Sequence, residues 1–176
     1  MKKNLAVQPC FSEIEKYEIG EGDIASFKKR GFIHLKGLFS KELMESLEEK
    51  VDAYLVAPTD KYQTGFNRVK YDLFEDDADL QELMGNGNFR SLICNLCGRD
   101  MLHAQTLAFE LKRLVNNGFP WHIGTQSFGY QRAEDYGCSL WVPMVEINNQ
   151  KQKGGMAYVP KNIVSGEFMY THVDPA

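Results

Sequence analysis

The spacing of the apolar residues changes at Gly98, and this change constrains the fold more than any other feature of the chain. Before Gly98, apolar side chains recur every three or four residues, as they do in amphipathic helices. After Gly98, they alternate with polar side chains in short stretches, as they do in strands that bury one face. Helices followed by short strands predict an α+β domain that ends in a sandwich or barrel, the arrangement of a jelly roll.

The first half is expected to contain four helices and one strand. The first helix ends at Arg30 before Gly31, and the second has apolar residues every four positions. The strand is expected at 32–35. Residues 54–74 are expected to form a loop, either a lid over a site or a segment packed on the barrel. The expected helix N-caps are Asp23, Ser40, Asp79 and Asn88.

The second half is expected to supply the strands of the barrel. Alternation over 101–114 predicts the first of them, and Asn116-Asn117-Gly118 predicts the turn that follows. Residues 1–21 have weak periodicity and are expected to form an N-terminal arm, so the domain comprises residues 22–176. Further short strands are expected at 128–130, 138–147 and 156–159.

The composition is that of an ordinary soluble globular protein, with 43% hydrophobic and 25% charged residues among 176. A formal net charge of -4 disfavours nucleic acid or a membrane surface as the partner, because both attract concentrated positive charge. No apolar run reaches the roughly 18 residues of a membrane span. The start of the chain has no apolar stretch typical of a secretion signal, so we expect a cytoplasmic protein. The oligomeric state cannot be inferred from the sequence.

Cys94 and Cys97 form a C-x-x-C pair, a spacing found in zinc sites and redox dithiols. A structural zinc site requires two more ligands, and the other cysteines, Cys10 and Cys138, do not form a second pair. The surrounding residues predict a helix with both cysteines of the pair on or beside its apolar face. We therefore favour buried packing over metal or redox chemistry, since free cysteine usually behaves as a small apolar residue.

Among the four histidines, His122 has the most suggestive position, between a turn and an expected strand. Imidazole binds iron, copper and zinc, so His122 is a candidate metal ligand, although one histidine specifies no particular metal. His34 and His103 lie inside expected strands, where a core or surface role is the simpler interpretation.

Three motifs follow one another in the second half of the chain: Pro120-Trp121-His122-Ile123-Gly124, Leu140-Trp141-Val142-Pro143-Met144 and Gly154-Gly155-Met156-Ala157-Tyr158-Val159-Pro160. Upstream, Gly31-Phe32-Ile33-His34-Leu35 precedes the helix that Ser40 is expected to cap. In order and spacing, these segments resemble the core and opening of the phytanoyl-CoA dioxygenase family, over residues 22–166. The resemblance implies a double-stranded β-helix, a jelly-roll or cupin-like barrel, with N-terminal helices.

The family resemblance also implies a reaction and a set of cofactors. Its members hold Fe(II) through two histidines and one carboxylate, bind 2-oxoglutarate at the iron and use O2 to oxidise a small molecule. By this resemblance, His122 is the first iron ligand and His172 is a candidate for the second. Trp141 is expected to line the cofactor pocket, and Arg68 is either a basic cofactor contact or a solvated surface arginine. The substrate is expected to be a free small molecule or a carrier-tethered intermediate.

The sequence departs from the family where the carboxylate ligand belongs, because Gly124 stands two residues after His122. Glycine has no side chain that can bind iron, and three interpretations stay open. In related halogenases, Ala or Gly leaves an iron position free for chloride, and we favour this interpretation, with Gly124 as the vacant carboxylate position. Alternatively, Glu134 or Asp135 supplies the ligand of a hydroxylase. The third interpretation is a catalytically inactive, cupin-like binding protein.

The end of the sequence departs from the family as well. The family binds the far carboxylate of 2-oxoglutarate through an arginine beyond the distal histidine, and no arginine follows His172. We therefore expect the sequence to be a fragment that lacks the last strands of the barrel.

Overall fold

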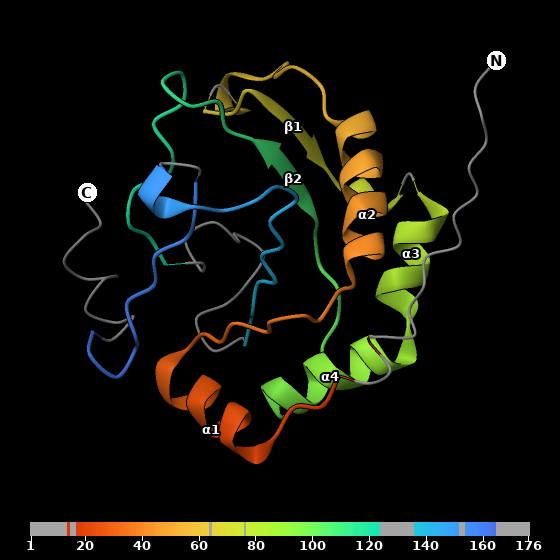
Figure 1. The fold of residues 1–176 in the computed structure, drawn as a ribbon, viewed down its shortest axis with the longest axis vertical. Coiled ribbons are helices and arrows are strands. Elements are labelled where there is room, and N and C mark those ends of the chain that lie inside the picture. The colour runs from red at the N-terminus through yellow and green to blue at the C-terminus, as the bar shows by residue number, and fades with distance from the viewer. Residues whose placement is uncertain are drawn as a thin grey trace.

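The computed structural model describes residues 14, 17–63, 65–75, 77–123, 136–151 and 154–164. Figure 1 shows α2 and α3 along one side of the molecule, α4 next to α1 at the bottom of the view, and the segment 154–164 on the side opposite α2 and α3. A two-stranded sheet lies at the end away from α1. The elements are α1 (Glu21–Arg30), α2 (Lys41–Tyr54), η2 (Lys61–Gln63), β1 (Arg68–Tyr71), η3 (Leu73–Glu75), α3 (Ala78–Gly85), α4 (Gly87–Cys97), β2 (Leu107–Glu110) and η5 (Asn149–Lys151).

The expected helices are present, but three of the four N-caps were predicted at the wrong residue. Ser40 caps α2 as expected, because its hydroxyl accepts a hydrogen bond from the Leu43 amide at 3.1 Å. The helices α3 and α4 are capped by Asp77 and Asn86, each two residues before the predicted cap. Gly20 is the N-cap of α1, and Asp23 instead accepts a hydrogen bond from the Gly20 amide at 3.2 Å.

The sheet contains one strand that was predicted and one that was not. β2 lies inside the expected strand at 101–114 but covers only four of its residues. β1 falls in the region that was expected to be a loop, and it pairs antiparallel with β2, with Arg68 opposite Glu110 and Val69 opposite Phe109. The predicted strand at 32–35 was wrong, because these residues have no regular structure.

The expected barrel strands at 138–147 and 156–159 are irregular in the structure, and 128–130 lies outside the described residues. Within the described part of the chain, the only sheet is the β1–β2 pair. The mixture of helices and sheet agrees with an α+β class. A double-stranded β-helix stays a prediction.

The hydrophobic core lies between α2, α3 and α4. Leu80 is only 2% exposed, and every fully buried apolar side chain in the described residues belongs to residues 14–97. Cys97 is also buried and Cys94 is half-buried, which confirms the packed position predicted for Cys97. The other core members include Leu43, Leu47, Val51, Leu73, Leu83, Phe89 and Leu92.

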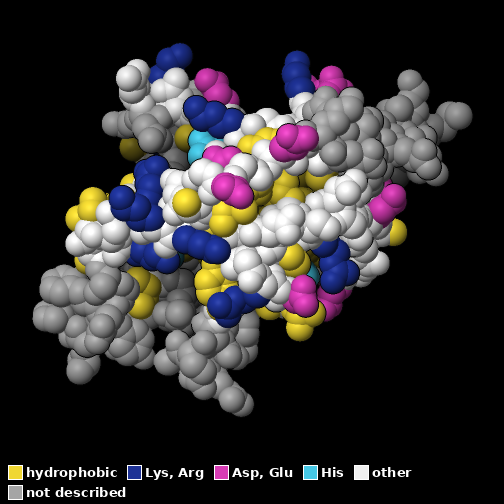
Figure 2. Space-filling view, turned by 90° about the horizontal axis from the view of Figure 1, so that it is seen from below, with side chains coloured by type: hydrophobic (Ala, Val, Ile, Leu, Met, Phe, Trp, Pro, Cys, Tyr) yellow, Lys and Arg dark blue, Asp and Glu magenta, His cyan; other side chains and the backbone are white. Residues whose placement is uncertain are grey.

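The described residues after Gly98 pack on this core, and none of their apolar side chains is fully buried. Leu102 and Leu114 are 89% and 92% exposed. The segment 154–164 is joined to the end of α1, where the Lys161 amide donates to the Arg30 carbonyl at 2.9 Å and Phe32 stacks on Tyr158. On the face in Figure 2, hydrophobic side chains lie exposed between basic and acidic ones.

Candidate functional site

An aromatic cluster connects the sheet to the segment that carries His122. The rings of Phe66, Phe109 and Phe119 meet in pairs, with centroids 5.3, 5.7 and 5.4 Å apart. Ring pairs of this kind contribute about 0.5–1.5 kcal/mol each beyond the area they bury. Asn116 strengthens the connection, because its side-chain amide donates to the Gly65 carbonyl at 3.0 Å. The sheet therefore holds Phe119, three residues before His122.

His122 is exposed, with the edge of its ring toward Phe119 at a centroid distance of 6.4 Å. Its Nδ1 lies 2.9 Å from the Pro120 carbonyl oxygen. A carbonyl oxygen only accepts hydrogen bonds, so Nδ1 carries the proton and donates it. In the neutral ring, Nε2 then keeps its lone pair and points away from this contact. Metal-binding histidines are commonly oriented by such a hydrogen bond from the other ring nitrogen.

Of the predicted iron ligands, only His122 lies within the described residues. They contain no group of three or more His, Cys, Asp or Glu side chains that could hold a metal ion. Gly124 and His172 lie outside the described residues, as do Glu134 and Asp135. His122 thus suits one ligand position, and the rest of the predicted ligand set stays a prediction.

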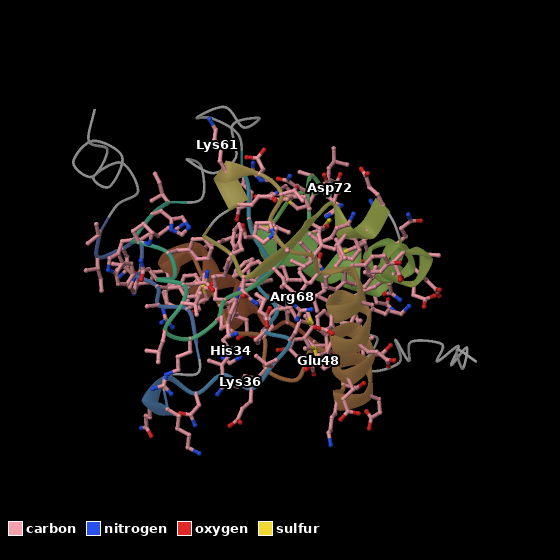
Figure 3. The ribbon with its side chains drawn as sticks, turned by 90° about the horizontal axis from the view of Figure 1, so that it is seen from above. His34, Lys36, Glu48, Lys61, Arg68 and Asp72 are labelled. Carbon is pink, nitrogen blue, oxygen red and sulfur yellow. The ribbon has the colours of Figure 1, made fainter. Side chains whose placement is uncertain are left out.

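The two other histidines in the described residues, His34 and His103, lie in different parts of the fold. His34 is exposed in the irregular segment between α1 and α2, where Figure 3 places it near Lys36. His103 precedes β2, with its Nε2 2.9 Å from the Thr106 hydroxyl and its ring edge-on to Phe74 at 5.2 Å. Neither histidine lies in a strand, contrary to prediction.

Trp141 lies in the irregular segment 136–147 and is 37% exposed. Within the described part of the chain, no ring contact or hydrogen bond joins Trp141 to His122. The structure therefore does not bring the two residues into one site by direct contact, and the role of Trp141 in a cofactor pocket stays a prediction.

Arg68 of β1, labelled in Figure 3, makes one ion pair with Asp52 of α2 and a second across the sheet with Glu110 of β2. Its Nε donates to Glu110 at 2.7 Å, and its Nη2 donates to the Asp52 carboxylate at 2.5 Å. The pKa of Arg68 is raised by the hydrogen bonds to Glu110 and Asp52. The pKa of Glu110 is lowered by Arg68 and by the Asn67 side chain, which donates to it at 2.6 Å. The predicted contact between Arg68 and 2-oxoglutarate would compete with these carboxylates, and it stays a prediction.

The sequence interpretation missed Glu110 as the partner of Arg68. The two residues are directly opposite in the antiparallel register. Alternation had placed Glu110 on the polar face of its strand, but the pairing could not be inferred while residues 54–74 were expected to form a loop.

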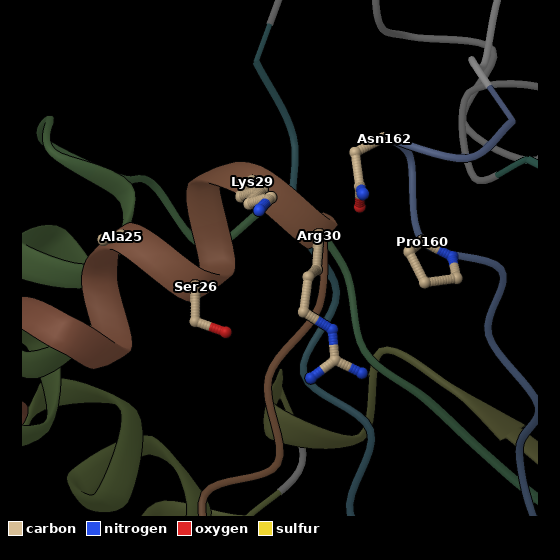
Figure 4. A pocket seen from close by; sticks show the side chains of 6 residues that line it. All are labelled: Ala25, Ser26, Lys29, Arg30, Pro160 and Asn162. Carbon is tan, nitrogen blue, oxygen red and sulfur yellow. The ribbon is translucent and has the colours of Figure 1, made fainter.

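Two open pockets lie away from His122. The larger, of about 440 Å³, is lined by Ala25, Ser26, Lys29, Arg30, Pro160 and Asn162 (Figure 4). Its two cations belong to the last turn of α1, where positive charge complements the helix dipole. The smaller, of about 360 Å³, lies beside the end of α4 and is lined by Ile19, Ile24, Cys94, Asn95, Gly98, Arg99 and Asp100.

No protein-family model, curated protein sequence or solved structure matches this chain. Among the described residues, no helix has both the length and the apolar character needed to span a membrane.

Proposed function

We propose that the chain is an Fe(II)- and 2-oxoglutarate-dependent oxidase related to the phytanoyl-CoA dioxygenase family, with His122 as its first iron ligand. The observation that supports this proposal is the hydrogen bond from His122 Nδ1 to the Pro120 carbonyl. It leaves Nε2 of the neutral ring with a lone pair and restricts the orientation of the ring. The aromatic anchor at Phe119 supports the same function, since a metal ligand needs a fixed backbone.

Within this function, we propose halogenation, with chloride as the favoured halide, at an unactivated C–H bond. Gly124 offers no carboxylate, which leaves both space and a deficit of negative charge where an anion can bind. His172 would provide the second protein ligand and Trp141 a wall of the cofactor pocket. The iron and 2-oxoglutarate supply the oxidising chemistry when bound, and the protein positions the substrate and excludes side reactions. A hydroxylase with an atypical ligand set is the alternative.

The substrate in this proposal is a small molecule, free or tethered to a carrier, and the location is the cytoplasm.

Anaerobic titration with Fe(II) and 2-oxoglutarate tests the proposal. In related enzymes, the complex absorbs weakly in the visible region, so we expect this band with the full-length protein. His122→Ala should abolish the band because it removes a ligand. His34→Ala is the matched control, since His34 is also exposed, and it should retain the band. A full-length protein with no band, in a sample shown to be folded by circular dichroism, would instead favour the cupin-like binding protein.

Gly124→Asp separates halogenation from hydroxylation. The new carboxylate should occupy the iron position that we assign to chloride, so turnover should lose its chloride dependence and yield hydroxylated product. The measurement is product mass, with and without chloride. If the wild-type protein turned over at the same rate without chloride, halogenation would be excluded and hydroxylation would be the remaining oxidase reaction.

A further inference from the structure

The end of α4 contacts the segment 136–138 through three side-chain interactions. The Sγ atoms of Cys97 and Cys138 lie 3.6 Å apart, in van der Waals contact. The Tyr136 side chain hydrogen-bonds to Cys97, and the Arg99 guanidinium lies over the Tyr136 ring at 4.5 Å. These contacts hold together two sulfur atoms that are 41 positions apart in the sequence.

We propose that Cys97 and Cys138 are a redox pair that forms an intramolecular disulfide when the protein meets hydrogen peroxide or a small-molecule disulfide. The sulfur contact is specific to one cysteine of the C-x-x-C pair. Cys97 is buried against Cys138, whereas Cys94 is half-buried and lines the neighbouring open pocket. The C-x-x-C spacing therefore identifies the helix, and the tertiary contact identifies the reactive pair.

The reaction with peroxide balances in two steps. One thiol is oxidised to a sulfenic acid and releases one water, and the second thiol then displaces the sulfenic oxygen as a second water. Two thiol hydrogens and two electrons leave the protein, and peroxide is reduced to two waters. With a small-molecule disulfide, the first sulfur forms a mixed disulfide and releases one small thiol, and the second sulfur then attacks the first sulfur and releases the other small thiol.

The thiol of Cys138 stays protonated near neutral pH. Loss of hydration around the sulfur and the adjacent Cys97 raise the pKa of Cys138 to about 12. Cys138 therefore keeps its proton and can donate the S–H in the contact between the two sulfurs. An oxidant is required to convert this contact into a bond.

The bond would affect the part of the chain that carries the candidate site. The closed loop runs from Cys97 to Cys138 and includes β2, Phe119 and His122. The bond would also attach the segment leading to Trp141 to the end of α4. This inference does not depend on the proposed function, because the sulfur contact exists whatever the site binds.

Peptide mapping tests the pair. The full chain is treated with hydrogen peroxide, its remaining thiols are alkylated, and it is digested with trypsin without reductant. We expect the peptide 91–99, alkylated at Cys94, joined to the peptide 133–151, at a mass two hydrogens below the sum of these two peptides. A thiol reductant should separate them. The yield should not depend on protein concentration, since both cysteines belong to one molecule.

Three variants provide the controls, because the peptide 91–99 contains both Cys94 and Cys97. Cys94→Ser should retain the joined peptides, and Cys97→Ser should lose them. Cys138→Ser should also lose them, and circular dichroism shows whether each variant is folded. Free, alkylated Cys97 and Cys138 after oxidation of the folded protein would overturn the proposal. A bond from Cys138 to Cys94 or to Cys10 would overturn it as well.

Discussion

At the scale of single residues, Asp77 combines two stabilising roles. Its Oδ1 accepts hydrogen bonds from the Asp79 and Leu80 amides, both at 3.0 Å, at the start of α3. Its Oδ2 accepts from the Lys50 ammonium and the Tyr54 hydroxyl, both at 3.3 Å. One carboxylate therefore caps a helix and connects it to α2.

These contacts shift the titration of Asp77. Burial acts to raise its pKa, but the Leu80 amide and the Lys50 ammonium outweigh burial, and the net pKa is lowered from the ordinary value of 3.8. The unfolded chain consequently binds this proton more tightly than the folded chain does. The stability that the carboxylate contributes is fully present above its ordinary pKa and is lost as pH falls through the lower folded pKa.

Asp77→Asn and Asp77→Ala should separate these roles. Asparagine keeps the cap and loses the charge, so the free energy of unfolding should fall near neutral pH, and the difference from wild type should vanish in acid. Alanine also loses the cap, at a further cost of about 1 kcal/mol at every pH. Urea unfolding at a series of pH values measures the contribution of the charge and that of the cap. Glu48→Gln, on the exposed face of α2, controls for the loss of one charge. If the difference in free energy of unfolding between wild type and Asp77→Asn stayed the same from neutral to acidic pH, the charge of Asp77 would not be what stabilises the fold.

At the scale of elements, the end of α4 depends on Gly98. Its φ of 71° is left-handed, and its amide donates to the carbonyls of Cys94 and Asn95. An L-residue in this conformation costs roughly 1–2 kcal/mol because its Cβ crowds the backbone. The turn also directs Arg99 onto Tyr136, so the same glycine helps to place the segment 136–138.

Alanine at two glycines should have opposite effects. Gly98→Ala should lower the free energy of unfolding by roughly 1–2 kcal/mol, since the left-handed conformation remains. Gly22→Ala in α1 should raise it by about 0.5–1 kcal/mol, because alanine favours the helix and its Cβ would meet no atom within 4 Å. Thermal and urea unfolding of both variants provide the comparison. Equal effects of the two substitutions would rule out the conformational explanation.

At the scale of the whole molecule, the burial of apolar residues is uneven. The described residues bury their apolar side chains fully only in the segment 14–97, and residues after Gly98 leave Leu114, Trp121 and Ile163 exposed. The helical half therefore supplies most of the hydrophobic stabilisation, since this contribution follows the apolar area removed from water.

Leucine to alanine substitutions in the two halves should measure this asymmetry. Leu80→Ala should cost about 2–5 kcal/mol, because Leu80 is 2% exposed and its removal leaves a cavity. Leu102→Ala, at a residue 89% exposed, should change stability by less than about 0.5 kcal/mol. Calorimetry on both variants tests the difference. A large effect at Leu102 would mean that the second half contributes to the core.

Local patterns predicted the helical half well and the second half poorly. Apolar spacing located α2, and Ser40 identified its start, because both depend on residues within one or two turns. The caps of α3 and α4 were misplaced by two residues, since several acidic or amide side chains near each helix start can accept the same bonds. The strand β1 was missed because Arg68-Val69-Lys70-Tyr71 buries a single residue and its strand partner is distant in the sequence.

The sequence by itself predicted a mixture of helices and strands, the helix-rich first half and the choice of His122 as the candidate ligand. Only the tertiary structure decided that Arg68 pairs with Glu110, that Phe119 is anchored on the sheet and that Cys97 meets Cys138. The physical reason is the separation, along the sequence, of the residues that interact. Helix periodicity and capping arise from neighbours in the chain, whereas these contacts join residues ten to about forty positions apart, which only the folded chain brings together.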